Sequence, residues 1–208
     1  HLILLAKNLE GYHNLSKIVS YAFTEGFYYR PRVDKELLRL YHDGIICCSA
    51  CLGGELPQAI MRGDMQEARR VVEEFVSIFG EDYYLELQLH QSGIPRIDEQ
   101  VYENQKKVNA VLLQLAAEYG VNFIMADDAP AHDRLICLNT GRDLDDPNRM
   151  RYTWQEYLKS EEEMAALFPD HPEALATTAE IAGKVEEYSL EHKPLMPNFP
   201  IPDDFDVP

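Results

Sequence analysis

The sequence is poor in cysteine and in long apolar runs. Four cysteines among 208 residues are too few for a disulfide framework. No stretch approaches the roughly 18 consecutive apolar residues that a membrane-spanning helix needs, and the first residues lack the basic segment and cleavage site of a secretory signal. We therefore expect a cytoplasmic protein with no membrane-spanning part.

Basic residues are also scarce. The chain has 19 lysines and arginines against 36 aspartates and glutamates, which gives a net charge of −17. This balance disfavours a basic surface that wraps duplex DNA, and it leaves open a metal site, a protein docking surface or an enzyme of small substrates. With 46% hydrophobic and 26% charged residues, the composition is that of a globular chain rather than a disordered or fibrous one.

Three of the four cysteines lie close together in the apolar run 45–54. We expect Cys47 and Cys48 to be small buried hydrophobic residues of a strand, whereas Cys51 follows the strand at the start of a glycine-containing loop. Cys48 and Cys51 have the spacing of a redox pair or half a zinc site. Only Cys137 remains to complete such a site, so we favour the buried interpretation for the first two.

Four short apolar runs predict strands, at 2–6, 45–49, 83–88 and 121–126, and amphipathic stretches between them predict helices at 10–24, 34–41, 64–80 and 101–119. In the first helix the predicted inner face comprises Leu15, Ile18, Val19, Ala22 and Phe23. Strands that alternate with helices favour parallel βαβ units, in either part of an α/β barrel or a doubly wound sheet. Both architectures gather ligands at the carboxyl ends of the strands, here 49–51, 87–90 and 126–128.

Beyond residue 127 helices replace this alternation. We expect short helices at 131–139 and 154–159, then helices at 164–168 and 172–187, the former preceded by a capping box from Ser160 to Glu163. Residues 193–208 contain five prolines and predict an extended connector. The predicted organisation is therefore a βα portion over 1–127, a helical segment over 128–192 and a connector over 193–208, which together look like a piece of a longer protein.

Five ordered motifs carry a family resemblance. They are His1-Leu-Ile-Leu-Leu-Ala-Lys-Asn8, Glu25-Gly-Phe-Tyr-Tyr-Arg-Pro-Arg-Val-Asp34, Ser49-Ala-Cys-Leu-Gly-Gly-Glu55, Ala131-His-Asp-Arg-Leu-Ile-Cys137 and the run from Thr140 to Tyr152. Together they resemble the PHP (polymerase and histidinol phosphatase) domain of bacterial replicative DNA polymerase III alpha subunits. The resemblance implies an incomplete, distorted (βα)7 PHP barrel with a C-terminal helical appendage and a proline-rich tail.

PHP domains hold up to three divalent ions through His, Asp, Glu and sometimes Cys, and use them to hydrolyse phosphate esters. The resemblance implies that His1 and Cys51 are metal ligands, with zinc, manganese or magnesium as the ion. The next ligand motif of the family, which contains an aspartate and a histidine after the strand at 121–126, is not found intact in this chain. Either Asp128 is its aspartate and the accompanying histidine is lost, or Asp128 belongs to the later 131–137 element and the motif is absent from the sequence.

Other family ligands belong upstream of residue 1, so the chain carries only part of the ligand set. Glu86 and His90 are weaker candidates: we interpret Glu86 as a hydrogen-bonded strand carboxylate and His90 as a loop residue. His132, at the start of a predicted helix, is interpreted as a capping or packing residue rather than a replacement ligand.

Two functions follow from the resemblance. As part of a DNA-directed DNA polymerase in bacterial replication, the domain would be a metal-dependent 3′–5′ exonuclease or phosphoesterase. Alternatively it would be a scaffold that braces the polymerase and docks the proofreading exonuclease. In either role the sliding clamp is a further expected partner, and DNA is expected to bind through other domains. A free-standing phosphoesterase is disfavoured by the 140–152 motif and the proline-rich tail.

Overall fold

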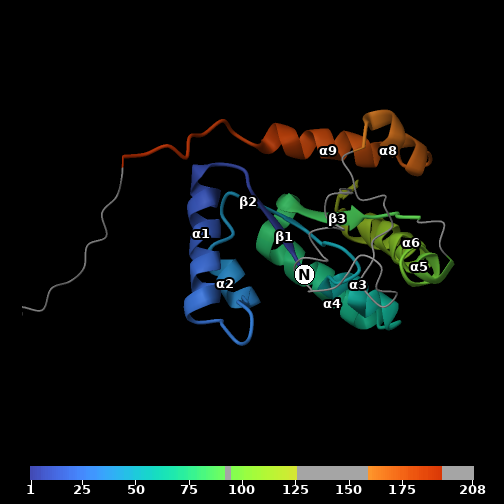
Figure 1. The fold of residues 1–208 in the computed structure, drawn as a ribbon, viewed down its shortest axis with the longest axis horizontal. Coiled ribbons are helices and arrows are strands. Elements are labelled where there is room, and N and C mark those ends of the chain that lie inside the picture. The colour runs from blue at the N-terminus through green and yellow to red at the C-terminus, as the bar shows by residue number, and fades with distance from the viewer. Residues whose placement is uncertain (92–94, 126–158, 194–208) are drawn as a thin grey trace, which may run out of the picture.

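The computed structural model describes residues 1–91, 95–125 and 159–193. Its elements, in chain order, are β1 (Ile3–Ala6), α1 (Leu9–Thr24), α2 (Lys35–Leu40), β2 (Ile45–Cys48), α3 (Glu55–Met61), α4 (Met65–Phe79), the 3-10 turn η1 (Gly80–Asp82), β3 (Tyr83–Leu87), α5 (Pro95–Gln100), α6 (Tyr102–Tyr119), β4 (Phe123–Met125), α8 (Glu161–Leu167) and α9 (Pro172–Lys184) (Figure 1). The helix predicted at 131–139, residues 154–158 of the helix predicted at 154–159, and the tail beyond 193 lie outside the described residues.

The four strands form one sheet in the order β1-β2-β3-β4. The pairs β2–β3 and β3–β4 are parallel, as predicted. The expectation of a uniformly parallel sheet is wrong for β1, which runs antiparallel to β2 with Ile3 opposite Cys48 and Ala6 opposite Ile45. The connection through α1 and α2 returns the chain to the end of the sheet where it left, and the Lys7 amide donates to the Gly44 carbonyl there over 2.9 Å.

Helix α1 is rotated relative to its predicted orientation. Its buried residues are Gly11, Asn14, Ile18 and Ala22, while Val19 and Phe23, both expected in the core, are 48% and 60% exposed. The cause is a close approach of backbones, because a Cβ at Gly11 would lie only 1.9 Å from the Gly44 carbonyl oxygen. This contact turns the Gly11 side of the helix toward the sheet.

The predicted capping box is confirmed, and two further helices begin at capping aspartates. Asp34 accepts a hydrogen bond from the Leu37 amide, Asp64 accepts one from Glu67, and Ser160 forms the predicted capping box with Glu163. Each cap satisfies amide groups that the first turn of a helix leaves without partners. Helices α3 and α5, by contrast, were not predicted.

The sheet is covered on both faces. Successive residues of a strand point to opposite sides, so Tyr83 and Leu85 join the main core with α4 and α6, where Phe75 stacks on Tyr83 at a ring separation of 5.3 Å. Tyr84 instead joins Ile46, Cys48 and Ile181, a residue of α9. Figure 1 shows α9, in orange, on the other side of the sheet from α4.

The described part of the segment predicted as a helical appendage is thus a layer of the fold. Lys184, the last residue of α9, pairs with Asp82 at 3.1 Å, and just beyond the helix the Glu186 amide donates to the Lys7 carbonyl over 2.7 Å. The burial of Ile181 against sheet residues explains why α9 packs on the sheet rather than forming a separate appendage. None of the helices in the described ranges has the length and apolar character to cross a membrane.

Candidate metal centre

The structure brings His1 and Cys51 together. Nδ1 of His1 lies 3.5 Å from Sγ of Cys51, although 50 residues separate them in the sequence. His1 precedes β1 and Cys51 follows β2, and the antiparallel pairing places the start of one strand beside the end of the other. The reversed direction of β1, which sequence reasoning missed, is therefore what forms this pair.

The loop 51–54 is folded around the cysteine. The Gly53 amide donates to Sγ of Cys51 over 3.4 Å, and the Gly54 amide donates to the Cys51 carbonyl over 2.7 Å. The Gln58 side chain of α3 donates to the Leu52 carbonyl over 2.6 Å. These hydrogen bonds hold the loop, and the Cys51 sulfur within it, in a defined position.

Gly53 also leaves room for the imidazole. A Cβ at this position would lie 2.6 Å from Nδ1 and 2.9 Å from Cε1 of His1, and both distances are shorter than van der Waals contact allows. A side chain here would therefore push the ring away from Cys51.

The spacing of the two donor atoms suits a metal ion. Tetrahedral zinc with bonds of about 2.3 Å to sulfur and about 2.0 Å to nitrogen places these atoms about 3.5 Å apart, the separation found between His1 and Cys51. No group of three or more His, Cys, Asp or Glu side chains suited to a metal is found in the described ranges. Asp128, the third candidate ligand, lies outside these residues.

The weaker candidates have structural roles. Glu86 is buried on β3 and accepts a hydrogen bond from Gln88 over 2.6 Å, and burial raises the pKa of its carboxyl. His90 is also buried, and its ring lies 2.7 Å from the side-chain nitrogen of Gln105. The prediction of a hydrogen-bonded strand carboxylate is confirmed, whereas His90, predicted as a simple loop residue, is part of a buried contact with α6.

Cys47 and Cys48 are fully buried, as predicted, at 0% exposure. Burial raises the pKa of both thiols, and that of Cys48 reaches about 12. Both side chains therefore stay neutral at physiological pH. Cys51, which is only partly buried, is the described cysteine available for ligation.

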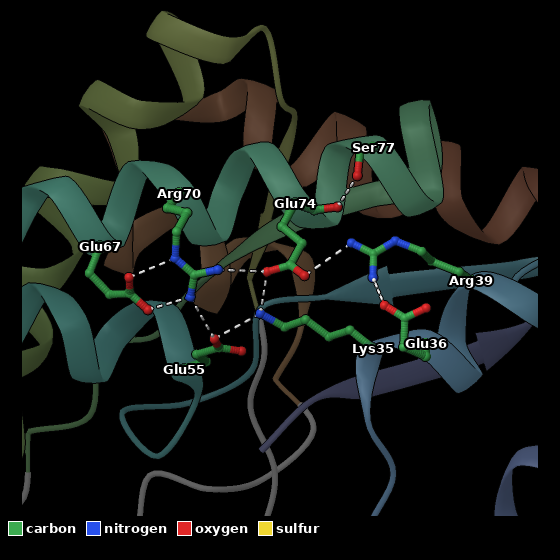
Figure 2. A network of polar contacts seen from close by, with 8 residues as sticks. All are labelled: Lys35, Glu36, Arg39, Glu55, Glu67, Arg70, Glu74 and Ser77. Carbon is green, nitrogen blue, oxygen red and sulfur yellow. Dashed lines mark hydrogen bonds and ion pairs between the residues drawn. The ribbon is translucent and has the colours of Figure 1, made fainter.

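A network of ion pairs joins the helices beside this loop (Figure 2). Lys35 of α2 lies 2.8 Å from both Glu55 of α3 and Glu74 of α4, and its ammonium group lies 4.9 Å from the centre of the Phe75 ring. Arg39 and Arg70 also contact Glu74, which lowers the pKa of that carboxyl, mainly through the Lys35 hydrogen bond. Because Glu55 directly follows the 51–54 loop, the network fixes α3, and with it the loop, against α2 and α4.

The chain is similar in sequence to known proteins. Residues 1–90 match the family model of the PHP domain. The DNA polymerase III subunit alpha of Borreliella burgdorferi is 41% identical over 217 residues, covering 100% of this chain and 18% of that protein. The corresponding subunit of Treponema pallidum is 39% identical over 215 residues (99% and 18%), and that of Thermus aquaticus is 38% identical over 218 residues (98% and 17%).

Residues 1–90, with the His1–Cys51 pair, thus belong to the class of PHP domains. The chain as a whole is homologous to bacterial DNA polymerase III alpha subunits, which confirms the resemblance seen in the sequence. It spans less than a fifth of the length of these relatives.

Proposed function

We propose that this chain is the PHP module of a bacterial replicative DNA polymerase and that His1 and Cys51 are two ligands of a divalent metal site acting on phosphate esters. The observation that carries the proposal is the 3.5 Å separation of Nδ1 and Sγ in a loop built around the thiol. The substrate class is a phosphodiester, such as the 3′ end of a DNA strand, and the parent activity is that of a DNA-directed DNA polymerase. The names of the relatives support this parent activity.

In this proposal the four-stranded sheet is part of a distorted (βα)7 barrel. Two observations support it: the parallel strands β2 to β4 and the position of the candidate ligands at the carboxyl end of β2. Asp128 follows β4 and is proposed as a third ligand, because the carboxyl ends of parallel strands meet at one edge.

The residues present have defined roles toward the ion. The Gly53 amide donates a hydrogen bond to Sγ of Cys51, Gly53 leaves space for the His1 ring, and the Lys35–Glu55 pair holds α3 in place. A bound divalent ion supplies an activated water and neutralises charge on a phosphate. Mixed nitrogen, sulfur and carboxylate ligands suit zinc, whereas an oxygen-rich set would suit manganese or magnesium.

The test is metal analysis of the intact protein together with a 3′–5′ exonuclease assay. We expect Cys51→Ala and His1→Ala each to lower both the metal content and the nuclease activity. Cys48→Ala is the matched control. This thiol is buried in the small cluster with Ile46 and Tyr84, on the face of the sheet away from the main core, and is not part of the candidate site. Unchanged metal content in both site variants would refute the ligand assignment.

A second candidate function is a scaffold that docks another replicase subunit, such as the proofreading exonuclease or the sliding clamp. The observation that favours it is a set of large apolar side chains exposed around the end of α1 and the start and end of α2: Phe23, Phe27, Tyr28, Tyr29 and Leu40, at 57–82% exposure. Tyrosine and phenylalanine in such a setting are typical of protein interfaces. Tyr29→Ala weakens partner binding under this hypothesis and leaves metal content unchanged.

A further inference from the structure

The chain leaves the sheet in an unusual way at the end of β2, just before Cys51. The Ser49 amide donates to the Tyr84 carbonyl over 3.0 Å, which continues the parallel pairing of β2 with β3. In a regular parallel ladder the Ser49 carbonyl would next accept from the Glu86 amide. Here the Glu86 amide donates instead to the side-chain hydroxyl of Ser49, over 2.9 Å. The hydroxyl therefore takes the place of a main-chain carbonyl in the sheet.

The Ser49 carbonyl faces away from this ladder, toward the loop that holds Cys51. A Cβ at Gly54 would lie 2.4 Å from the Ser49 carbonyl oxygen, so the two stretches of main chain approach closely there. The hydrogen bond between the Glu86 amide and the Ser49 hydroxyl is buried, and Ser49 is 2% exposed. A buried amide without an acceptor is costly. The hydroxyl thus satisfies an amide that the turned carbonyl no longer reaches.

Ala50 makes the turn itself. Its φ of 62° lies in the left-handed region, which among the non-glycine residues of the described ranges is shared only with Tyr29. Tyr29 is exposed, whereas Ala50 is buried. A left-handed backbone is unfavourable for alanine and persists where the surrounding structure imposes it, often at a functional site. The turn takes Cys51 out of the line of β2, and its Sγ lies 3.5 Å from Nδ1 of His1.

We propose that Ser49 is a positioning residue for the Cys51 ligand. Its hydroxyl completes the pairing with β3, which allows the chain to turn at Ala50 and to present the thiol to the His1 ring. The inference rests on the proposed metal site and adds a residue that acts on it through the main chain. Without the hydroxyl, the Glu86 amide would recruit the Ser49 carbonyl, as in a regular strand. The chain would then straighten at Ala50 and carry Cys51 away from His1.

The experiment compares Ser49→Ala with the wild type in the intact protein. Cobalt titration, followed by the sulfur-to-cobalt charge-transfer band, should show affinity weakened about tenfold or more, as expected for lost support of a ligand. In EDTA at one fixed pH, iodoacetamide should modify Cys51 about tenfold faster, because the loop that holds the thiol opens more often. Mass spectrometry of the labelled peptide measures this rate without any metal.

Position 50 supplies a second test that leaves Ser49 in place. Ala50→Gly should keep the cobalt affinity and the alkylation rate of the wild type, because glycine adopts the left-handed backbone freely. Ala50→Val should lose cobalt affinity about tenfold, because a branched side chain disfavours this backbone. Equal cobalt affinities in these two variants would overturn the role of the turn.

The matched control for Ser49→Ala is Thr177→Val. It removes another buried hydroxyl, which donates to the Glu173 carbonyl over 3.0 Å within α9, and it should leave both measurements unchanged. Wild-type cobalt affinity in folded Ser49→Ala, or an equal loss in Thr177→Val, would overturn the proposal. Absence of cobalt binding by the wild type would instead refute the proposed metal site. The alkylation rate in EDTA would then still decide whether Ser49 positions Cys51, and an unchanged rate in Ser49→Ala would refute that role.

Discussion

Gly53→Ala tests the ligand pair without removing either ligand. The new Cβ would lie 2.6 Å from Nδ1 of His1, and ordinary contact needs about 3.5 Å, so the ring has to retreat by about 1 Å. His1 is exposed and its side chain can turn away, and the backbone at Gly53 is not in the left-handed region, so the fold itself tolerates alanine. The separation of Nδ1 and Sγ, 3.5 Å in the wild type, is what the substitution disrupts.

We expect Gly53→Ala to weaken metal binding about 10–100-fold, the range typical of lost support for a metal ligand. The assay is a cobalt titration of the intact protein that follows the sulfur-to-cobalt charge-transfer band. Gly183→Ala is the matched control, because a Cβ there meets nothing within 4 Å. Wild-type cobalt affinity in Gly53→Ala would refute the reasoning, since it would mean that the His1 ring does not need its position against Gly53.

Two further predictions concern the fold and the thiols. Gly11→Ala should destabilise the protein by about 3 kcal/mol in denaturant unfolding, because the new Cβ would overlap the Gly44 carbonyl. Alanine in place of glycine usually stabilises a helix, so the sign of the effect is diagnostic. Stability equal to that of Gly183→Ala would contradict the close approach of Gly11 and Gly44. At pH 8, iodoacetamide should modify Cys51 well before Cys48, because burial raises the pKa of the latter to about 12 and keeps it a neutral thiol. Mass spectrometry of the labelled peptides measures both rates, and equal rates in the native protein would count against the described burial.

Local signals in the sequence predicted local structure well. The caps Asp34, Asp64 and Ser160 act within one turn of their own helices, so the chemistry that determines them is readable from neighbouring residues. The buried face of α4 likewise follows from its apolar periodicity: Ala68, Val71, Val72, Phe75 and Ile78 recur at helical spacing and are all buried.

Features that depend on distant residues were not predictable in this way. The rotation of α1 follows from the approach of Gly11 to Gly44, 33 residues apart, which no helical periodicity encodes. The direction of β1 is equally non-local, because a connection long enough for a crossover is also long enough to return the chain to its starting end. For the candidate site, the motif resemblance supplied His1 and Cys51 individually, whereas their contact required the antiparallel pairing.

The register of β1 against β2 has a consequence for how this protein tolerates change. His1 reaches Cys51 only while Ile3 stays opposite Cys48. A slip by one residue would shift β1 by about 3.4 Å and turn each of its side chains to the other face of the sheet. Insertion or deletion of a single residue within the β1–β2 ladder would thus separate the histidine from the cysteine while leaving both in the sequence, whereas length changes in the exposed 27–33 loop would leave the ladder in register.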